Sequence, residues 1–302
     1  MEIKEGYLSF RDYKTYYRIV NPNGRKTPLL LLHGGPGSTH NSFELLDHVA
    51  WDDDRPIVMY DQLGCGLSSD ADISFYNKDI WVEELQNLRR QLSLDEVHLL
   101  GHSWGGMLEI IYLCDYAPKG VKSVVFSSTL ASASLWRKET HRLIGLLDEK
   151  TRMDILHGEE TGDFESESFR TATDEYLHHF VSGPWTDNDP ECLTRKKRTG
   201  HVSYVTAWGP SEYAPMGNLK DYEYLDKLDR IQCPVLLLSG ANDESTPYQN
   251  LEMYHRLDCE KKWIMFASSR HMSLYEEHDK YVTELIQFLN DVERKENDNH
   301  EV

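Results

Sequence analysis

The sequence predicts an α/β fold in which a mostly parallel sheet is interrupted by an inserted, mainly helical segment. Short apolar runs bounded by turn residues alternate with stretches of helical periodicity, which is the pattern of buried parallel strands joined by crossover helices. The alternation stops after Ser128 and resumes near Pro234. The residues between these points are rich in charge and include two Gly-Pro pairs. An insertion between sheet strands at this point is placed to act as a cap.

The expected elements follow the chain in order. Alternating aromatic and aliphatic residues predict an opening hairpin over residues 7–20. Buried strands are expected at residues 29–32, 57–60, 97–100, 124–126, 234–238 and 263–266. Helices are expected at residues 79–92, 107–116, 247–257 and 276–289. The polar residues 294–302 are expected to be frayed.

The domain organisation follows from these elements. Residues 1–129 are expected to form the first part of an α/β core, residues 130–225 the helical cap, and residues 226–302 the second part of the core. The length of 302 residues allows about two domains of ~150 residues, and one α/β core with an insertion fits that length equally well.

Composition excludes several function classes. Acidic residues outnumber basic ones by 51 to 32, giving a formal net charge of −19, which argues against a nucleic-acid partner. No apolar stretch approaches the roughly 20 residues that span a bilayer, and the first residues lack an apolar leader. We therefore expect a cytoplasmic protein without a membrane partner. The five scattered cysteines contain no CxxC pair, which favours reduced thiols over disulfides or a zinc site. The sequence specifies no oligomeric state.

The strongest chemical signal is the GxSxG motif at residues 101–105, Gly-His-Ser-Trp-Gly. It lies between an expected strand and an expected helix, the context of a nucleophile elbow, in which Ser103 occupies a strained turn. The turn also presents the Trp104 N–H at a helix N-terminus, where a developing oxyanion is stabilised. A glycine-rich structural turn is the alternative, and the strand–turn–helix context disfavours it.

A serine nucleophile needs a base and an acid that orients the base. Asp243 follows the fifth buried strand and His271 follows the sixth, at the carboxyl edge where sites form in open α/β sheets. We therefore expect Asp243 and His271 to complete a triad with Ser103. Glu244 is the rival acid, and His278 is the rival base.

Two glycine-rich loops follow the first two buried strands. The loop at residues 33–37, His-Gly-Gly-Pro-Gly, is expected to supply a second oxyanion donor from the Gly35 N–H. The loop at residues 61–68 contains Cys65, which has no positioned base in its sequence context and is therefore expected to be structural. The histidines of these motifs lack helix-spaced partners, so we expect no metal and no cofactor.

The motifs HGGPG, DQLGCGLS, GHSWGG, GANDESTP and SSRHMS, in this order, resemble those of the proline iminopeptidase (prolyl aminopeptidase) family of α/β-hydrolase serine peptidases. The resemblance covers nearly the whole chain and is looser in the insertion. It implies an α/β-hydrolase fold and catalysis without a metal. It also supports Ser103, Asp243 and His271 as the triad, and Gly35 and Trp104 as the oxyanion donors.

The resemblance further implies that acidic groups hold the α-ammonium of the substrate. The matching positions are Glu244, directly after the expected triad aspartate, and Glu212, in the cap stretch at residues 209–213. Two carboxylates in a water-poor pocket would bind an ammonium far better than a neutral acyl chain. The alternative is that both are ordinary surface carboxylates. Cap aromatic residues either line this pocket or pack the cap: Trp136, Trp185, Tyr204, Trp208 and Tyr213.

These observations predict a serine aminopeptidase that releases N-terminal proline or another small or apolar residue through an acyl-enzyme. The expected substrate is a peptide, amino-acid amide or arylamide with a free N-terminus. Two alternatives remain open: a carboxylesterase or lactonase of the same fold, and a non-catalytic α/β-hydrolase binding protein.

Overall fold

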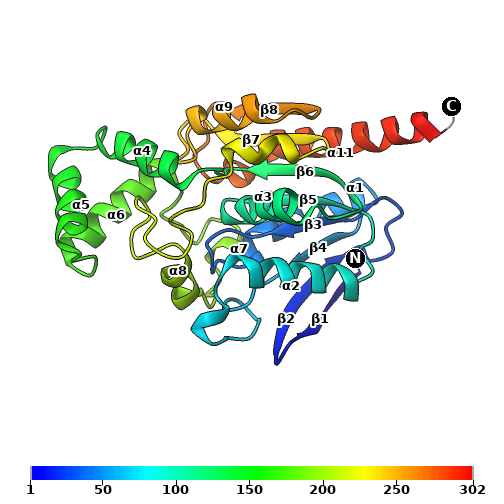
Figure 1. The fold of residues 1–302 in the computed structure, drawn as a ribbon, viewed down its shortest axis with the longest axis horizontal. Coiled ribbons are helices and arrows are strands. Elements are labelled where there is room, and N and C mark those ends of the chain that lie inside the picture. Colours follow the sequence, from blue (N-terminus) through cyan, green and yellow to red (C-terminus); the bar gives the residue numbers. More distant parts are fainter. Residues whose placement is uncertain (1, 301–302) are drawn as a thin grey trace.

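The computed structural model describes residues 2–300 and contains one eight-stranded sheet in the order β1-β2-β4-β3-β5-β6-β7-β8 (Figure 1). The strands β1 and β2 form an antiparallel hairpin, β2 is antiparallel to β4, and every other neighbouring pair is parallel. The strands are β1 (Ile3–Phe10), β2 (Tyr13–Val20), β3 (Leu29–Leu32), β4 (Ile57–Tyr60), β5 (Val97–His102), β6 (Val121–Ser127), β7 (Val235–Gly240) and β8 (Lys261–Phe266).

Helices cover both faces of the sheet, and the fold class predicted from the sequence is confirmed. The core α-helices are α1 (Val49–Asp52), α2 (Lys78–Gln91), α3 (Trp104–Tyr116), α9 (Pro247–Arg256), α10 (Ser273–Glu276) and α11 (His278–His300). Three 3₁₀ helices accompany them: η1 (His40–Leu46), η2 (Ile73–Phe75) and η3 (Leu225–Arg230).

The strand β3 shows why the apolar runs form a central sheet. Its four leucines are fully buried, and successive side chains point to opposite faces. Leu30 and Leu32 pack in the hydrophobic cluster that contains residues of α2 and α3, while Leu29 and Leu31 pack in the cluster that contains residues of α11. Burial of each leucine contributes about 1.5–3 kcal/mol, and helices on both sides of the strand bury all four side chains.

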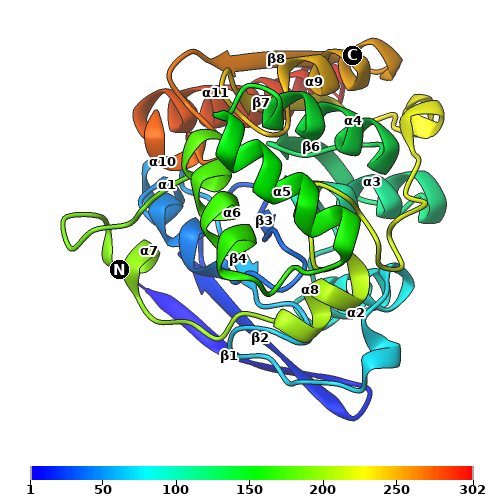
Figure 2. The same cartoon turned by 90° about the vertical axis from the view of Figure 1, so that its left-hand side faces the viewer.

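Five α-helices, the cap helices, lie between β6 and β7 in the chain: α4 (Ala133–Ile144), α5 (Glu149–Thr161), α6 (Glu167–Phe180), α7 (Glu191–Thr194) and α8 (His201–Ala207). The first three project to the left in Figure 1, and Figure 2 shows α5 and α6 in front of the ends of β3 and β4. A separate hydrophobic cluster, which includes Ile155, Phe169 and Tyr176, joins α5 to α6. The division of the chain at residues 130 and 225 remains a prediction.

The last helix, α11, continues to His300, so the expectation that residues 294–302 would be frayed is wrong for residues 294–300. Residues 301 and 302 lie outside the described residues. The apolar periodicity weakens after Leu289, but Val292 is buried and Glu293 forms an ion pair with the buried Arg55 (2.9 Å). Arg55 lies 238 positions earlier in the chain, so this anchor is invisible to local sequence patterns. No helix of residues 2–300 is both long enough and apolar enough to cross a membrane.

Candidate active site

The turn between β5 and α3 places Ser103 in a conformation that few residues adopt, with φ 54° and ψ −121°. The flanking glycines are a steric requirement. A Cβ on Gly101 would lie 2.4 Å from the Gly105 carbonyl carbon, and a Cβ on Gly105 would lie 1.9 Å from the Leu32 carbonyl oxygen. Neighbouring strands hold the turn, because the Ser103 N–H donates to the Ser127 carbonyl of β6 (2.9 Å). This geometry is that of a strained elbow with a serine at its apex.

The loops after β7 and β8 bring Asp243 and His271 together. His271 Nδ1 lies 2.7 Å from Asp243 Oδ1, and both side chains are buried. The Ser245 N–H also donates to Asp243 Oδ1 (2.8 Å). Because the carboxylate accepts the Nδ1 proton, His271 Nε2 is left free to accept another proton. Burial opposes the charged imidazolium, but the negative charge and hydrogen bond of Asp243 raise the pKa of His271 above its ordinary value.

A histidine next to the serine connects these loops to the elbow. His102 Nε2 lies 3.0 Å from the His271 carbonyl oxygen, and the two imidazole rings pack edge to face with centroids 4.8 Å apart. Burial lowers the pKa of His102 to about 4, so its ring is neutral and donates its Nε2 proton to that carbonyl. The structure thus places His271 beside the residue that precedes Ser103.

The loop after β3 lies against the elbow from the other side. A Cβ on Gly34 would lie 3.1 Å from the Ser103 Cβ, and Gly35 has φ +115°, a conformation suited to glycine. Trp104 is the first residue of α3, so its N–H has no partner within the helix. Within residues 2–300, no hydrogen bond is made by the N–H of Gly35 or by that of Trp104. Both amides are therefore available to an oxygen atom bound at Ser103.

Two glutamates converge on this site. Glu244 directly follows Asp243 and is 3% exposed, and its Oε2 atom has no hydrogen-bonding partner among the described residues. Burial raises its pKa well above the ordinary value, and the negative charges of Glu212 and Asp243 raise it further. Burial also raises the pKa of Glu212, against the opposing effects of a Tyr204 hydrogen bond and the nearby His271. Glu212 therefore lies within electrostatic range of both Glu244 and His271.

Aromatic residues of the cap hold Glu212 in place, a role that sequence reasoning missed. The Tyr204 hydroxyl of α8 donates to Glu212 Oε2 (2.5 Å). The indole N–H groups of Trp136 and Trp208 both donate to the Glu212 backbone carbonyl, at 2.9 and 3.2 Å. The only sequence signal for this role was the number of aromatic residues in the insertion, because hydrogen bonds between distant segments produce no local sequence pattern. Trp185 lies elsewhere and packs edge to face on Tyr275.

The alternatives weighed from the sequence lie in other surroundings. His278 contacts His48 through its Nε2 atom (3.0 Å) and the Leu274 carbonyl through Nδ1 (2.8 Å), so it has no carboxylate comparable to that of Asp243. Cys65 is fully buried, and burial raises the pKa of its thiol well above the ordinary value. A thiol in such an environment is unreactive. Among the described residues, no group of three or more potential ligands could hold a metal ion.

Comparisons with known proteins show the family of this chain. Residues 27–278 match the family described as alpha/beta hydrolase fold. The chain is 50% identical over 291 residues to a proline iminopeptidase of Lactobacillus helveticus, covering 96% of this chain and 98% of that one. The chain belongs to the proline iminopeptidase family. The family relative from Clostridioides difficile (strain 630) is 47% identical, with 96% and 99% of the two chains covered.

Solved structures agree with this family membership. The crystal structure of the proline iminopeptidase of Mycobacterium smegmatis superimposes with a TM-score of 0.84 at 26% identity, over 96% of this chain and 98% of that one. The crystal structure of VinJ superimposes with a TM-score of 0.87 at 29% identity, over 96% and 99% of the two chains. The likeness extends over the cap helices as well as the sheet, because it covers nearly the whole chain.

Proposed function

We propose that this protein is a serine aminopeptidase that releases N-terminal proline, or another small or apolar residue, from peptides, amino-acid amides or arylamides. The observation that carries the proposal is the pair of buried carboxylates, Glu212 and Glu244, beside the His271–Asp243 pair. The names of the family relatives, proline iminopeptidase, support the same activity.

The carboxylate pair suits a cationic N-terminus. Two buried negative charges destabilise each other, which is why burial and mutual repulsion hold the pKa of Glu244 well above its ordinary value. A substrate ammonium, or the secondary ammonium of an N-terminal proline, would compensate this charge and supply hydrogen-bond donors to the unpartnered Glu244 Oε2. A neutral acyl group would leave the pair uncompensated, which disfavours an esterase or lactonase acting on such substrates.

Acylation follows from the geometry of the triad. Ser103 Oγ attacks the carbonyl carbon of the N-terminal residue, while His271 Nε2 takes the hydroxyl proton. Asp243 holds the Nδ1 proton of His271 and stabilises the imidazolium that forms. The N–H groups of Gly35 and Trp104 bind the oxyanion of the tetrahedral intermediate. His271 then gives its proton to the leaving amine as the C–N bond breaks.

Deacylation reverses the same proton transfers. A water molecule gives a proton to His271 Nε2 and attacks the acyl carbon, and the second tetrahedral intermediate collapses when His271 returns the proton to Ser103 Oγ. The free amino acid leaves with its ammonium group released from Glu212 and Glu244. No redox step and no co-substrate other than water is required.

A small chromogenic panel tests the proposal: Pro-arylamide, Ala-arylamide, N-blocked Pro-arylamide and a short-chain ester. We expect turnover of the unblocked arylamides, none of the blocked one, and complete loss in Ser103→Ala. The exposed Ser74→Ala in η2 is the matched control and retains wild-type activity. Turnover of the ester alone would support a carboxylesterase. If no substrate is turned over and a serine-reactive phosphonate does not label Ser103, the result would support a non-catalytic binding protein.

A further inference from the structure

The two amides that face the proposed oxyanion come from segments far apart in the chain. Gly35 lies in the loop after β3, and Trp104 begins α3. Hydrogen bonds to an oxyanion act only when both donors lie close to about 3 Å from it, and a misplacement of about 1 Å costs roughly a hundredfold in rate. The protein therefore needs a connection that fixes these two segments relative to each other.

The side chain of Gln62, in the loop after β4, makes that connection. Its Oε1 atom accepts a hydrogen bond from the Trp104 indole Nε1 (2.7 Å), and its Nε2 atom donates to the His33 carbonyl oxygen (3.0 Å). The backbone N–H of Gln62 also donates to His33 Nε2 (3.0 Å). Gln62 is 1% exposed, so water does not compete for these bonds. One residue thus binds both donor-bearing segments.

The bond to the His33 ring fixes the direction of the Gly35 N–H. Because His33 Nε2 accepts the proton of the Gln62 amide, the ring proton is on Nδ1, which donates to the Gly34 carbonyl (2.9 Å). Burial lowers the pKa of His33 to about 4, so the ring stays neutral and keeps this tautomer at neutral pH. In a planar trans peptide the carbonyl and the following N–H point in opposite directions. The Gly35 N–H is therefore directed away from the His33 ring.

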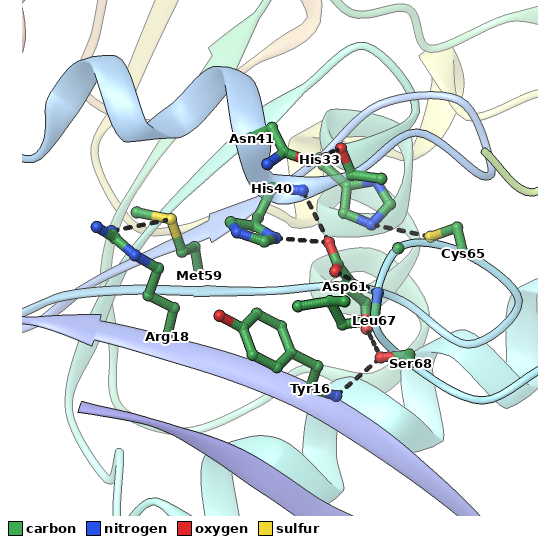
Figure 3. Close-up of polar contacts among 12 residues, drawn as sticks. Tyr16, Arg18, His33, His40, Asn41, Met59, Asp61, Cys65, Leu67 and Ser68 are labelled. Carbon is green, nitrogen blue, oxygen red and sulfur yellow. Dashed lines mark hydrogen bonds and ion pairs between the residues drawn. The ribbon is translucent and has the colours of Figure 1, made fainter. Parts of the chain in front are cut away.

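Asp61, the residue before Gln62, binds the other end of the loop after β3. Asp61 Oδ1 accepts hydrogen bonds from the His40 backbone N–H (2.9 Å) and from His40 Nδ1 (2.8 Å), and its Oδ2 accepts from the Leu67 N–H (2.8 Å). Figure 3 shows these contacts, with the His33 ring and the Cys65 sulfur beside them. The adjacent residues Asp61 and Gln62 therefore bind the loop after β3 at both of its ends, Asp61 at His40 and Gln62 at His33.

We propose that Gln62 is a positioning residue of the oxyanion hole: its side chain fixes the Gly35 loop and the start of α3 in the relative position that both N–H donors require. This inference rests on the proposed serine hydrolase function. It assigns Gln62 a role in transition-state stabilisation that is distinct from substrate binding, because its bonds go to the donor segments and leave the Glu212–Glu244 pair untouched.

The variant Gln62→Leu removes both side-chain bonds at similar volume. We expect kcat on Pro-arylamide to fall about ten- to a hundredfold, with KM within about twofold of wild type, when rates are expressed per site titrated by a serine-reactive phosphonate. The inhibition constant of a prolyl boronate, which forms a tetrahedral adduct on Ser103, should weaken by a similar factor. A purely structural role would lower the melting temperature and the fraction of titrated sites while leaving kcat per site unchanged.

A second variant guards against a failure of Gln62→Leu to fold. Trp104→Phe removes the indole donor of the same bond but keeps the backbone N–H, and it should lower kcat in the same direction. In the double variant the two losses should not multiply, because both remove one shared interaction. Asn87→Leu is the matched control: it removes a different buried amide, bonded to the Ser9 carbonyl (3.0 Å), and should leave kcat unchanged.

Two results would overturn the proposal. One is a kcat per titrated site within twofold of wild type in folded Gln62→Leu and Trp104→Phe; the other is full multiplicativity in the double variant. The proposed function fails on separate grounds, namely when the wild-type protein turns over no unblocked arylamide. A wild-type protein that cleaves only esters would still allow the Gln62 test on that substrate.

Discussion

Glu244→Gln isolates the charge that the proposed amine site contributes. The substitution keeps the size and shape of the side chain but replaces a carboxylate oxygen that has no partner within the described residues. Asp243, the adjacent residue, keeps its hydrogen bond to His271, so the triad is unaffected. The expected result is a rise in KM for substrates with a free amine, while a neutral ester is hydrolysed at the wild-type rate.

The magnitude follows from the loss of one charge-assisted hydrogen bond in a buried site. Such bonds contribute about 1.5–3 kcal/mol, and about 1.4 kcal/mol corresponds to a tenfold change. The expected fall in kcat/KM for Pro-arylamide is therefore roughly 10- to 150-fold. Glu212 limits the loss, because removing the Glu244 charge relieves the repulsion between the two carboxylates and lets Glu212 ionise more fully.

The pH dependence of the kinetics tests the roles of the two glutamates independently. Both glutamates must be deprotonated to bind a cation, and their pKa values are raised, so the affinity for free-amine substrates falls as the pH drops through these raised values. In Glu244→Gln the remaining carboxylate loses its repulsive neighbour, and this limb of the profile moves to lower pH. The ester profile reports protonation of His271 alone and should stay in place.

Steady-state kinetics on Pro-arylamide and the short-chain ester, between about pH 5 and pH 9, measure both effects. Glu159→Gln is the matched control, since Glu159 is a cap carboxylate whose hydrogen-bond partners among the described residues are His141 (2.8 Å) and Ser211 (3.5 Å). An equal loss on the arylamide and the ester would refute the reasoning, as would an arylamide KM that does not change.

Three further outcomes are expected. Asp243→Asn should lower kcat about 10³- to 10⁴-fold, because His271 loses the acceptor that fixes its tautomer; a loss below tenfold would contradict the assignment. Gly105→Ala should lower the free energy of unfolding, measured in urea, by about 1–3 kcal/mol or more, since its Cβ would overlap the Leu32 carbonyl oxygen; an unchanged midpoint would contradict the geometry. Burial opposes ionisation of Glu293, yet its histidine and arginine partners lower its pKa to about 2. Glu293→Gln should therefore cost about 1–2 kcal/mol at pH 7, and the difference from wild type should disappear as the pH falls from about 4.5 towards 2; a difference that is constant with pH would refute it.

Local patterns in the sequence predict the parts of this molecule that depend on neighbouring residues. The apolar run at Leu29–Leu32 predicts a buried strand because it is short, apolar at every position and bounded by turn residues. The glycines around Ser103 predict an elbow because both positions exclude a Cβ. Each of these two features depends on residues that are close together in the chain, so a single sequence is sufficient to predict it.

Contacts between distant segments explain what the sequence does not reveal. The end of α11 depends on the ion pair between Glu293 and Arg55. The orientation of Glu212 depends on Tyr204 in α8 and on the indoles of Trp136 in α4 and Trp208, which follows α8. Gln62 has no distinguishing local pattern, although its side chain joins two loops. Such residues become visible only when the fold places their partners beside them.

The position of the two glutamates has a consequence for how substrates are selected. Glu244 lies in the loop after β7, whereas Glu212 accepts hydrogen bonds from Tyr204 in α8 and from the indoles of Trp136 in α4 and Trp208, directly after α8. At the proposed amine site, a bound ammonium would therefore form an ion bridge between the loop after β7 and the cap, and substrate binding would be thermodynamically linked to the packing of the cap helices on the sheet. Under this proposal, substitutions in α4 or α8 would change the selectivity for amine substrates without altering the turn that carries Ser103.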